Sequence, residues 1–393
     1  MDNILFFITG LITILGLTAL LSNDKKRIKT KLKPVGIMLA IQLVMTWALL
    51  KTTAGVAVTS KVSWAFNKLI EYAKEGVSFL LGGIEVAEGG SVFFFDVLLI
   101  IIFTSVVIGI LNYLKIIPVI VKYLGRAVNK VTGVGTTESF NAVASMLFGQ
   151  SEVFLIIKDK LGSINSKRLY TISASAMGSV SASIMGAYMT LLDPKFVIVA
   201  IPLNMFSALI IASIVNPYET SDEPEIKIEK DKRSFFQVIS DSILDGGKMA
   251  LIVGAMLIGF IALIAMIDAM FGGIFGITLT EILGYIFAPL AILIGVPVAE
   301  SLQVGSIMAV KLISNEFVAM LTLQGVELSA KAYGILATFL ISFANFSSIG
   351  IIAGSVKSLN SKQGDTIAKF GLKLLVGATL ASLLSASIVG LFL

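Results

Sequence analysis

Long apolar runs are the feature that most limits what this chain can fold into. About 20 apolar residues in a helix cross the ~30 Å hydrocarbon core of a bilayer. A membrane β-barrel would instead need alternating segments of about ten residues, and the runs here are continuous. Hydrophobic residues make up 56% of the 393 residues and charged residues only 14%, so the sequence predicts an all-α polytopic membrane protein. About eight spans are expected, at 3–22, 34–50, 92–113, 168–192, 196–215, 248–270, 330–356 and 366–393.

The distribution of basic residues predicts how these spans are oriented. The loop 23–33, after the first span, is rich in Lys and Arg, and such loops stay cytoplasmic. The N-terminus is then expected outside. The first run has no basic region before it, so we interpret it as an uncleaved span rather than a signal peptide. The formal charge of +5 is attributed to cytoplasmic loops and not to a nucleic-acid partner.

Two further apolar regions fit this orientation only if they do not cross the membrane. Region 133–160 is broken by Gly149–Glu152, and 282–323 is broken by Ser314–Glu316. About 15 residues precede the first break, and a helix of that length rises only ~22 Å. Each region therefore predicts a re-entrant helical hairpin that enters and leaves on one face. Non-helical backbone at such depth requires a covering of protein or a water-filled cavity.

Three other segments have one apolar and one polar helical face, at 61–81, 115–131 and 232–245. We expect these to be amphipathic helices at the membrane interface. The polar stretch that starts at Asn216 separates two halves of the chain and is expected to be a mobile loop. The predicted division is 1–131 (mostly scaffold), 132–217 (hairpin and two spans), 218–281 (loop, interfacial helix and span), 282–357 (hairpin and broken span) and 358–393 (last span).

The two halves repeat one another at three landmarks. Glu138 corresponds to Glu300 at an offset of 162, and Glu152 corresponds to Glu316 at an offset of 164. Ser183 corresponds to Ser348 at an offset of 165. Because three crossings separate the hairpins, the second hairpin enters from the opposite side. An inverted repeat with broken helices is typical of secondary transporters, which bind their substrate near the midplane.

The polar residues of the breaks indicate what kind of solute could bind. Amides and carboxylates suit a neutral solute with hydroxyl and heteroaromatic groups, whereas a phosphate would require Arg or Lys. The chain has no His and no Cys, so any proton must be carried by a carboxylate. The polar and adjoining residues expected at the midplane are Gln150, Ser151, Glu152, Ser179, Val180, Ser183, Ile184, Asn315, Glu316, Asn345, Ser347 and Ser348.

Simpler interpretations stay open for several of these residues. A serine in a membrane helix usually packs or bonds to backbone, and Lys311 with Glu316 could form a structural ion pair. Glu138 and Glu300 are expected to stabilise helix N-termini, where the dipole favours a carboxylate. For Glu152 and Glu316 we favour a functional role, because both lie at helix breaks and both repeat. A membrane-embedded enzyme or a passive channel explains the pattern less well, so no enzymatic activity is expected.

Three motifs give the chain a specific resemblance. "ESFNAVASMLFGQSE", "AVKLISNEFVAM" and "FANFSSIGI" resemble motifs of the concentrative nucleoside transporters, and the detail is most similar to their bacterial NupC-like branch. The resemblance covers the whole chain. It implies import of nucleosides such as uridine, cytidine or adenosine across the bacterial cytoplasmic membrane. It also implies a homotrimer whose protomers each have a scaffold and a mobile transport part, with no cofactor. The expected movement is elevator-like or rocking.

The resemblance also implies roles for individual residues. Gln150 and Glu152 would contact the nucleobase, with Ser151 beside them. The ribose would be held by three residues, Glu316, Asn345 and Ser348. Two apolar residues would pack near the ligand, Ile184 and Phe343. Lys311 would hold the second hairpin, together with Asn315.

One departure from the family pattern concerns the coupling ion. Sodium-coupled members usually have Asn at the position of Ser145, and Phe148 precedes the Gly of the first tip. Ser179 and Val180 could still offer oxygens, so a residual sodium site is the alternative, although no dedicated metal site is expected. Proton coupling fits better, with Glu316 and Glu152 as the carriers, because a carboxylate is costly in an apolar setting when charged.

Overall fold

The computed structural model describes residues 2–84, 92–219 and 233–393, and no strand occurs in these ranges. Six helical segments there are long and apolar enough to cross a bilayer. They agree with six of the predicted spans. They are α1 (Asp2–Leu20), α2 (Ile28–Lys51), α4 (Ile100–Tyr113, preceded by π-helical Phe94–Leu98), α10 (Pro194–Val215), α11 (Phe235–Phe275) and α17 (Ser361–Leu391).

The other two predicted spans are each interrupted in the middle. The span 330–356 is α15 (Ala330–Leu340) and α16 (Phe346–Leu359), as its predicted break requires. The span 168–192 was expected to be continuous, which is wrong, because it consists of α8 (Ser166–Gly178) and α9 (Ala182–Leu191). Ser181 explains the interruption, since its side chain accepts from the Ser183 N–H and caps α9. Serine competes in this way with helical backbone bonding.

Both predicted hairpins contain two helical arms. Hairpin 1 is α6 (Thr136–Ser145) followed by α7 (Val153–Ile156) and the 3-10 turn Lys158–Ser163. Hairpin 2 is α13 (Val298–Ile313) and α14 (Glu316–Gln324). The start predicted for hairpin 2 was wrong, because 282–323 also includes most of a separate helix, α12 (Leu279–Leu293). Gly295, at a φ of +101°, allows the turn between α12 and α13.

Two of the three amphipathic segments form helices of their own. These are α3 (Thr53–Leu81) and α5 (Ile116–Thr132). The third, 232–245, was expected to be separate from the following span, but α11 continues from Phe235 through 41 residues. Its N-terminus has a capping box of Ser234 and Gln237, and no proline interrupts it. Most of the predicted loop before it, 220–232, lies outside the described residues.

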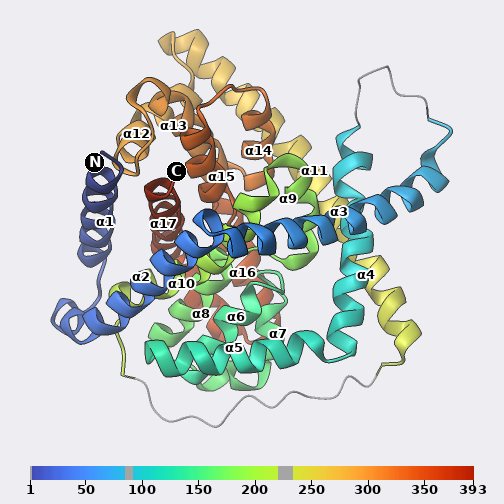
Figure 1. The fold of residues 1–393 in the computed structure, drawn as a ribbon, viewed down its shortest axis with the longest axis horizontal. Coiled ribbons are helices and arrows are strands. Elements are labelled where there is room, and N and C mark those ends of the chain that lie inside the picture. Colours follow the sequence, from blue (N-terminus) through green and yellow to red (C-terminus); the bar gives the residue numbers. More distant parts are fainter. Residues whose placement is uncertain (1, 85–91, 220–232) are drawn as a thin grey trace.

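The internal repeat covers six consecutive helices. The first residues of α12 to α17 follow those of α5 to α10 at offsets between 162 and 167. In Figure 1, α5, α6 and α7 lie at the bottom of the molecule, and α12, α13 and α14 lie at the top. The two hairpins therefore enter from opposite ends, as an inverted repeat requires.

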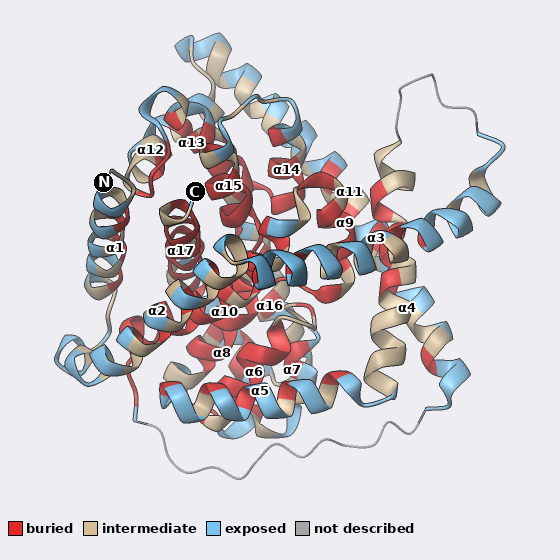
Figure 2. Cartoon of the chain, viewed as in Figure 1, coloured by how far each residue is buried: buried red, intermediate tan, exposed pale blue. Residues whose placement is uncertain are grey.

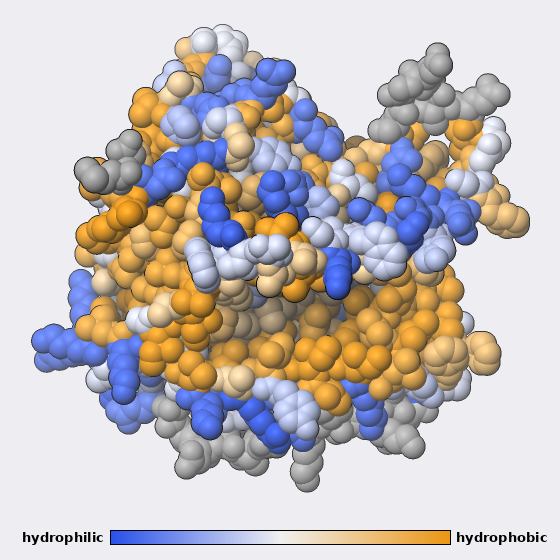
Figure 3. All heavy atoms as spheres, viewed as in Figure 1, coloured by the Kyte–Doolittle hydropathy of each residue, from blue (hydrophilic) through white to orange (hydrophobic). Residues whose placement is uncertain are grey.

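The two repeats bury their last helices at the centre. Figure 2 shows α10 and α17 mostly buried, whereas α1, α2 and α11 are largely exposed. In Figure 3 a hydrophobic band crosses this face, with hydrophilic residues above and below it. Protein thus covers the hairpins and broken helices, while the outer helices present apolar side chains to the surroundings. Irregular backbone at that depth requires such a cover.

Candidate substrate-binding site

The tip of hairpin 2, hereafter tip 2 (Ser314–Glu316), carries a buried and fully engaged carboxylate. Glu316 is 4% exposed. Its Oε1 accepts from the Tyr188 hydroxyl of α9 at 2.8 Å, and its Oε2 accepts from Asn345 Nδ2 at 3.2 Å. Asn345 caps α16 by accepting from the Ser348 N–H at 2.9 Å. The structure therefore brings together the predicted trio of Glu316, Asn345 and Ser348. Glu316 accepts hydrogen bonds from residues of both repeats.

Lys311 and Asn315 hold hairpin 2 in shape. The Asn315 side chain accepts from the Val318 N–H at 3.0 Å and caps α14. Lys311 is fully buried and donates to the Phe339 carbonyl and to Ser342 Oγ, which lie at the end of α15. In the described part of the chain it forms no salt bridge with Glu316. The alternative of a direct ion pair is therefore not seen there, and Lys311 connects hairpin 2 to the break between α15 and α16.

The two helix breaks meet at the centre of the molecule. The Phe343 N–H donates to the Ser179 carbonyl at 3.3 Å, so the break of the second repeat contacts that of the first. The Ala182 N–H donates to the Leu147 carbonyl at 3.3 Å, which joins the first break to hairpin 1. Ile184 and Phe343, the apolar residues expected near a ligand, are both buried. So is Val180, which was expected to offer an oxygen to a coupling ion.

The tip of hairpin 1, hereafter tip 1 (Phe148–Glu152), is engaged far less. The Glu152 carboxylate accepts from the Gly149 N–H of its own turn at 3.3 Å, and its side chain is exposed. Gln150 Oε1 is buried without a hydrogen-bond partner among the described residues, as is Ser348 Oγ. Ser151 is partly exposed beside them. Buried polar atoms without partners are rare, and a bound ligand would satisfy them.

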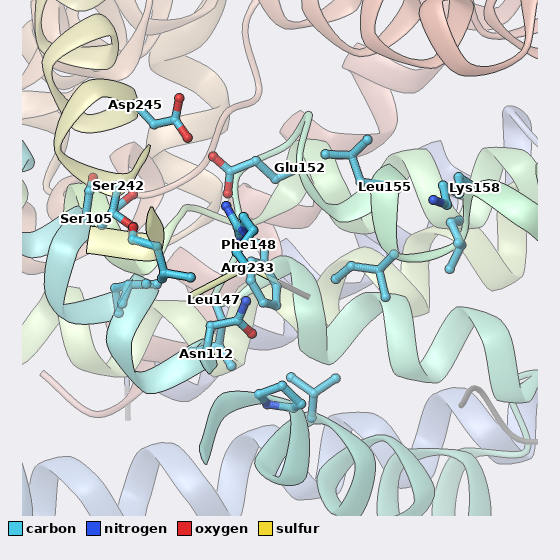
Figure 4. A pocket seen from close by; sticks show the side chains of 18 of the residues that line it. Ser105, Asn112, Leu147, Phe148, Glu152, Leu155, Lys158, Arg233, Ser242 and Asp245 are labelled. Atoms are coloured by element: carbon cyan, nitrogen blue, oxygen red, sulfur yellow. The ribbon is translucent and has the colours of Figure 1, made fainter. Parts of the chain in front are cut away.

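A cavity of about 830 Å³ lies beside tip 1. Of the predicted residues, Phe148, Glu152 and Ser183 line it, whereas the buried Glu316 does not. The opposite wall is formed by α4 and α11, and Figure 4 shows Asp245 of α11 pointing toward Glu152. The structure therefore places the two tip glutamates in different surroundings, one in a cavity and one in the protein interior.

Two glutamates near the bases of the hairpins connect each hairpin to the next helix. Glu138 is buried and forms an ion pair with Arg168 in the first turn of α8, with Oε2 to Nη2 at 3.0 Å. Burial, and then the Glu138 carboxylate, raise the pKa of the neighbouring Tyr218 well above its usual value, so its hydroxyl stays protonated. Glu300 accepts from the N–H and Oγ of Ser329, the cap of α15, both at 2.7 Å. Both glutamates were expected to stabilise helix N-termini. In addition, Glu138 joins hairpin 1 to α8 and Glu300 joins hairpin 2 to α15.

The residues expected at a sodium site make local bonds. Ser145 Oγ donates to the Asn141 carbonyl at 2.8 Å, and Ser179 Oγ donates to the Ser175 carbonyl at 2.6 Å. No cluster of three or more acidic residues that could hold a metal ion occurs in the ranges the structure describes. Sequence reasoning missed Tyr188 as a partner of Glu316. Its only signal is a position one helical turn after Ile184 on α9.

Comparisons with known proteins agree with this architecture along the whole chain. The family model described as "Na+ dependent nucleoside transporter C-terminus" matches residues 196–390, and the corresponding N-terminal model matches 9–84. A third model, "Nucleoside recognition", matches 94–195. The chain belongs to the concentrative nucleoside transporter family. It is therefore a multi-pass nucleoside transporter and not an enzyme.

Two bacterial relatives and one solved structure align with this chain over nearly their full length. The chain is 36% identical to the purine nucleoside transport protein NupG of Bacillus subtilis, with 98% of each chain covered. It is 30% identical to the nucleoside permease NupC of Helicobacter pylori, covering 99% of this chain and 98% of that protein. The solved structure of CNTnw in an inward-facing substrate-bound state has a TM-score of 0.91 at 29% identity, covering 99% and 98%.

Proposed function

We propose that this protein imports nucleosides across the bacterial cytoplasmic membrane by proton symport, with alternating access to the two sides. The observation that carries the proposal is the buried Glu316, held by Tyr188 and Asn345 where both repeats meet. It forms no salt bridge among the described residues, and a charged carboxylate is costly at that depth. A proton that travels on Glu316, with Glu152 as a second carrier, removes that cost.

The nucleoside is proposed to bind between the two tips. Glu316, Asn345 and Ser348 offer a carboxylate, an amide and a hydroxyl to the ribose. Gln150 and Glu152 offer complementary groups to the nucleobase, with Ser151 beside them. The unpartnered Gln150 Oε1 and Ser348 Oγ support this arrangement, since each is an atom that a polar ligand would pair. Ile184 and Phe343 supply apolar contacts.

Sodium symport is the second candidate. It is favoured by the description of two matching family models as Na+ dependent. The mouse sodium/nucleoside cotransporter 1, 25% identical over 95% of this chain and 62% of that protein, also favours it. Against it stand Ser145, where the sodium-coupled pattern has Asn, and the local bonding of the Ser145 and Ser179 hydroxyls. We therefore keep the proton as the proposed coupling ion.

The proposed working assembly is a homotrimer with the N-terminus outside. α4 and α11 belong to its scaffold. The proposed mobile transport part is residues 132–217 and 282–357, which contain the two hairpins and the interrupted helices α8–α9 and α15–α16. The relative NupG is named for purine nucleosides, so adenosine and inosine belong in any substrate panel with uridine and cytidine.

The test is uptake of radiolabelled adenosine and uridine into proteoliposomes with either an inward proton gradient or an inward sodium gradient. Accumulation driven by protons and unaffected when sodium is replaced is the expected result. Accumulation that follows sodium alone would contradict the coupling ion, and equilibration without accumulation would indicate a passive channel. Unlabelled competitors then rank the nucleobases at two pH values.

A further inference from the structure

The cavity beside tip 1 has two walls that belong to different parts of the molecule. One wall is hairpin 1, which presents Leu147, Phe148 and Glu152. The other is formed by α4 and α11, which present Ser105, Asn112, Ser242 and Asp245. Figure 4 shows Asp245 and Asn112 on either side of Phe148, both within the cavity. A solute that leaves tip 1 through this cavity therefore meets α4 and α11 next.

Asn112 and Asp245 have no structural task that explains them. Among the described residues, the Asn112 amide makes no hydrogen bond. The Asp245 carboxylate has one weak contact, to Lys248 Nζ at 4.0 Å. The side chains of Asp245 and Lys248 are each 72% exposed. Such a contact contributes almost nothing to stability. Both side chains are thus available to a ligand in the cavity.

The wall that carries them is fixed by close helix packing. A Cβ added at Gly109 of α4 would lie 2.1 Å from Ser242 Oγ of α11. A Cβ added at Gly246 would lie 2.7 Å from the Cα of Ile102. Small residues bring membrane helices this close, so α4 and α11 form a unit. Asn112 and Asp245 are consequently held at set positions across from a tip that is only weakly bonded.

The charges of the cavity fit a neutral ligand. Its lining contains three anionic residues and three cationic ones, which are Glu152, Asp159, Asp245, Lys158, Lys160 and Arg233. At about 830 Å³ it falls within the range of small-molecule sites, roughly 300–1,000 Å³. A nucleoside fits this combination of size, neutrality and hydrogen-bonding groups.

We propose that Asn112 and Asp245 form an exit subsite that binds the nucleoside after it leaves tip 1 and before it reaches the cytoplasm. The inference rests on the proposed function. The Asn112 amide donates and accepts hydrogen bonds with the nucleoside, and the Asp245 carboxylate accepts them from its N–H and hydroxyl groups. Glu152 still faces both from the other wall. The nucleoside replaces its hydrogen bonds to tip 1 by hydrogen bonds to Asn112 and Asp245 one at a time. This lowers the barrier to its release, and release is the slow step in many enzyme cycles.

The experiment compares the two faces of the protein in proteoliposomes of defined orientation, with radiolabelled adenosine added to one side at a time. For Asn112→Ala we expect the cytoplasmic-side KM to rise about fivefold, and for Asp245→Asn about tenfold, since the second removes charge-assisted bonds. The external-side KM should change less than about twofold, because that face loads the site between the tips. Asp245→Glu should retain a cytoplasmic-side KM near that of the wild type.

Asp365→Asn is the matched control, since Asp365 is an exposed acid that pairs with Lys357 at 2.7 Å, and neither residue lines the cavity. Its KM values should match the wild type on both faces. Unchanged KM on the cytoplasmic face in both test variants would overturn the exit subsite alone. Equal increases on both faces would overturn it too, since they indicate an effect on the central site or the fold. Absence of nucleoside transport by the wild type would overturn the proposed function and the subsite together.

Discussion

Tip 1 and tip 2 occupy equivalent places in the two repeats but are held in different ways. Glu316 of tip 2 is bonded to Tyr188 and Asn345, on helices of both repeats. Glu152 of tip 1 accepts from Gly149 in its own turn and faces a cavity. The arms differ as well, since hairpin 2 has helices of 16 and 9 residues whereas α7 of hairpin 1 has only 4.

This difference indicates which side of the protein is open. A tip bonded to both repeats closes its side of the central site, and a tip beside a cavity leaves its side accessible. In the proposed orientation the open side is cytoplasmic. Overall similarity does not decide the state, because CNTnw matches in an inward-facing state with a TM-score of 0.91 and, as a double variant, in an outward-facing state with 0.93. The hydrogen bonds of tip 1 and tip 2 are what distinguish the open side from the closed side.

The largest effect is expected from a substitution that removes the Glu316 carboxylate of tip 2. Glu316→Gln keeps the size of the side chain but replaces one carboxylate oxygen, which accepts from Tyr188 or Asn345, by an amide donor. It also removes the proposed proton carrier. Proton-driven nucleoside accumulation should fall about a hundredfold, as loss of charged hydrogen bonds predicts. Initial uptake rates in proteoliposomes measure this, with equal protein incorporation as the control. Accumulation at the wild-type level would show that tip 2 is not the coupled tip.

The next prediction compares the contacts of Glu138 and Glu300 near the bases of the two hairpins. Glu138→Gln leaves the part-buried Arg168 with a weaker partner and should lower the free energy of unfolding by about 2 kcal/mol. Glu300→Gln, at an exposed contact, should lower it by about 0.5 kcal/mol. Thermal unfolding of the purified protein in detergent gives both values. Equal shifts would mean that the buried ion pair adds nothing beyond a helix cap.

A smaller change tests whether the Tyr188 bond is what closes tip 2. Tyr188→Phe removes one hydroxyl from the Glu316 carboxylate and leaves the ring packed on Phe317, whose centroid lies 5.0 Å away. Nucleoside uptake efficiency should fall about tenfold. The measured quantity is kcat/KM for nucleoside uptake. Tyr170→Phe is the control, because the Tyr170 hydroxyl donates to the Lys373 carbonyl outside the site. An effect no larger than the control would contradict a role for the hydroxyl.

The smallest effect is expected at tip 1. Glu152→Gln removes only the second proposed proton carrier and leaves Glu316 in place. The side chain already faces the cavity, and an amide retains hydrogen bonds to a nucleobase. The KM for nucleoside uptake should rise about threefold. Should Glu152→Gln and Glu316→Gln reduce uptake equally, the two tips would be functionally equivalent despite their different bonding in this structure.

Much of the architecture follows from local properties of the sequence. Span length and hydropathy predict where continuous helices cross, and the polar breaks at Glu152 and Glu316 mark the two tips. The repeat was visible at three landmarks, although the structure extends it to six helices. These features depend on the bilayer thickness and on the nearest neighbours along the chain, which is why the sequence alone was sufficient for them.

The interruption of 168–192, the separate α12 and the continuity of α11 were mispredicted, because apolar content does not reveal the local signals there. These signals are the Ser181 cap, the turn at Gly295 and the absence of proline in α11. Tertiary contacts decided the rest. The bond between Tyr188 and Glu316 joins residues 128 positions apart, and Asp245 faces Glu152 only because α11 lines the cavity opposite hairpin 1. The sequence by itself determined that two glutamates lie at two tips. Only the folded chain determined that one is bonded in the interior and the other faces a cavity, since the partners of each come from distant helices.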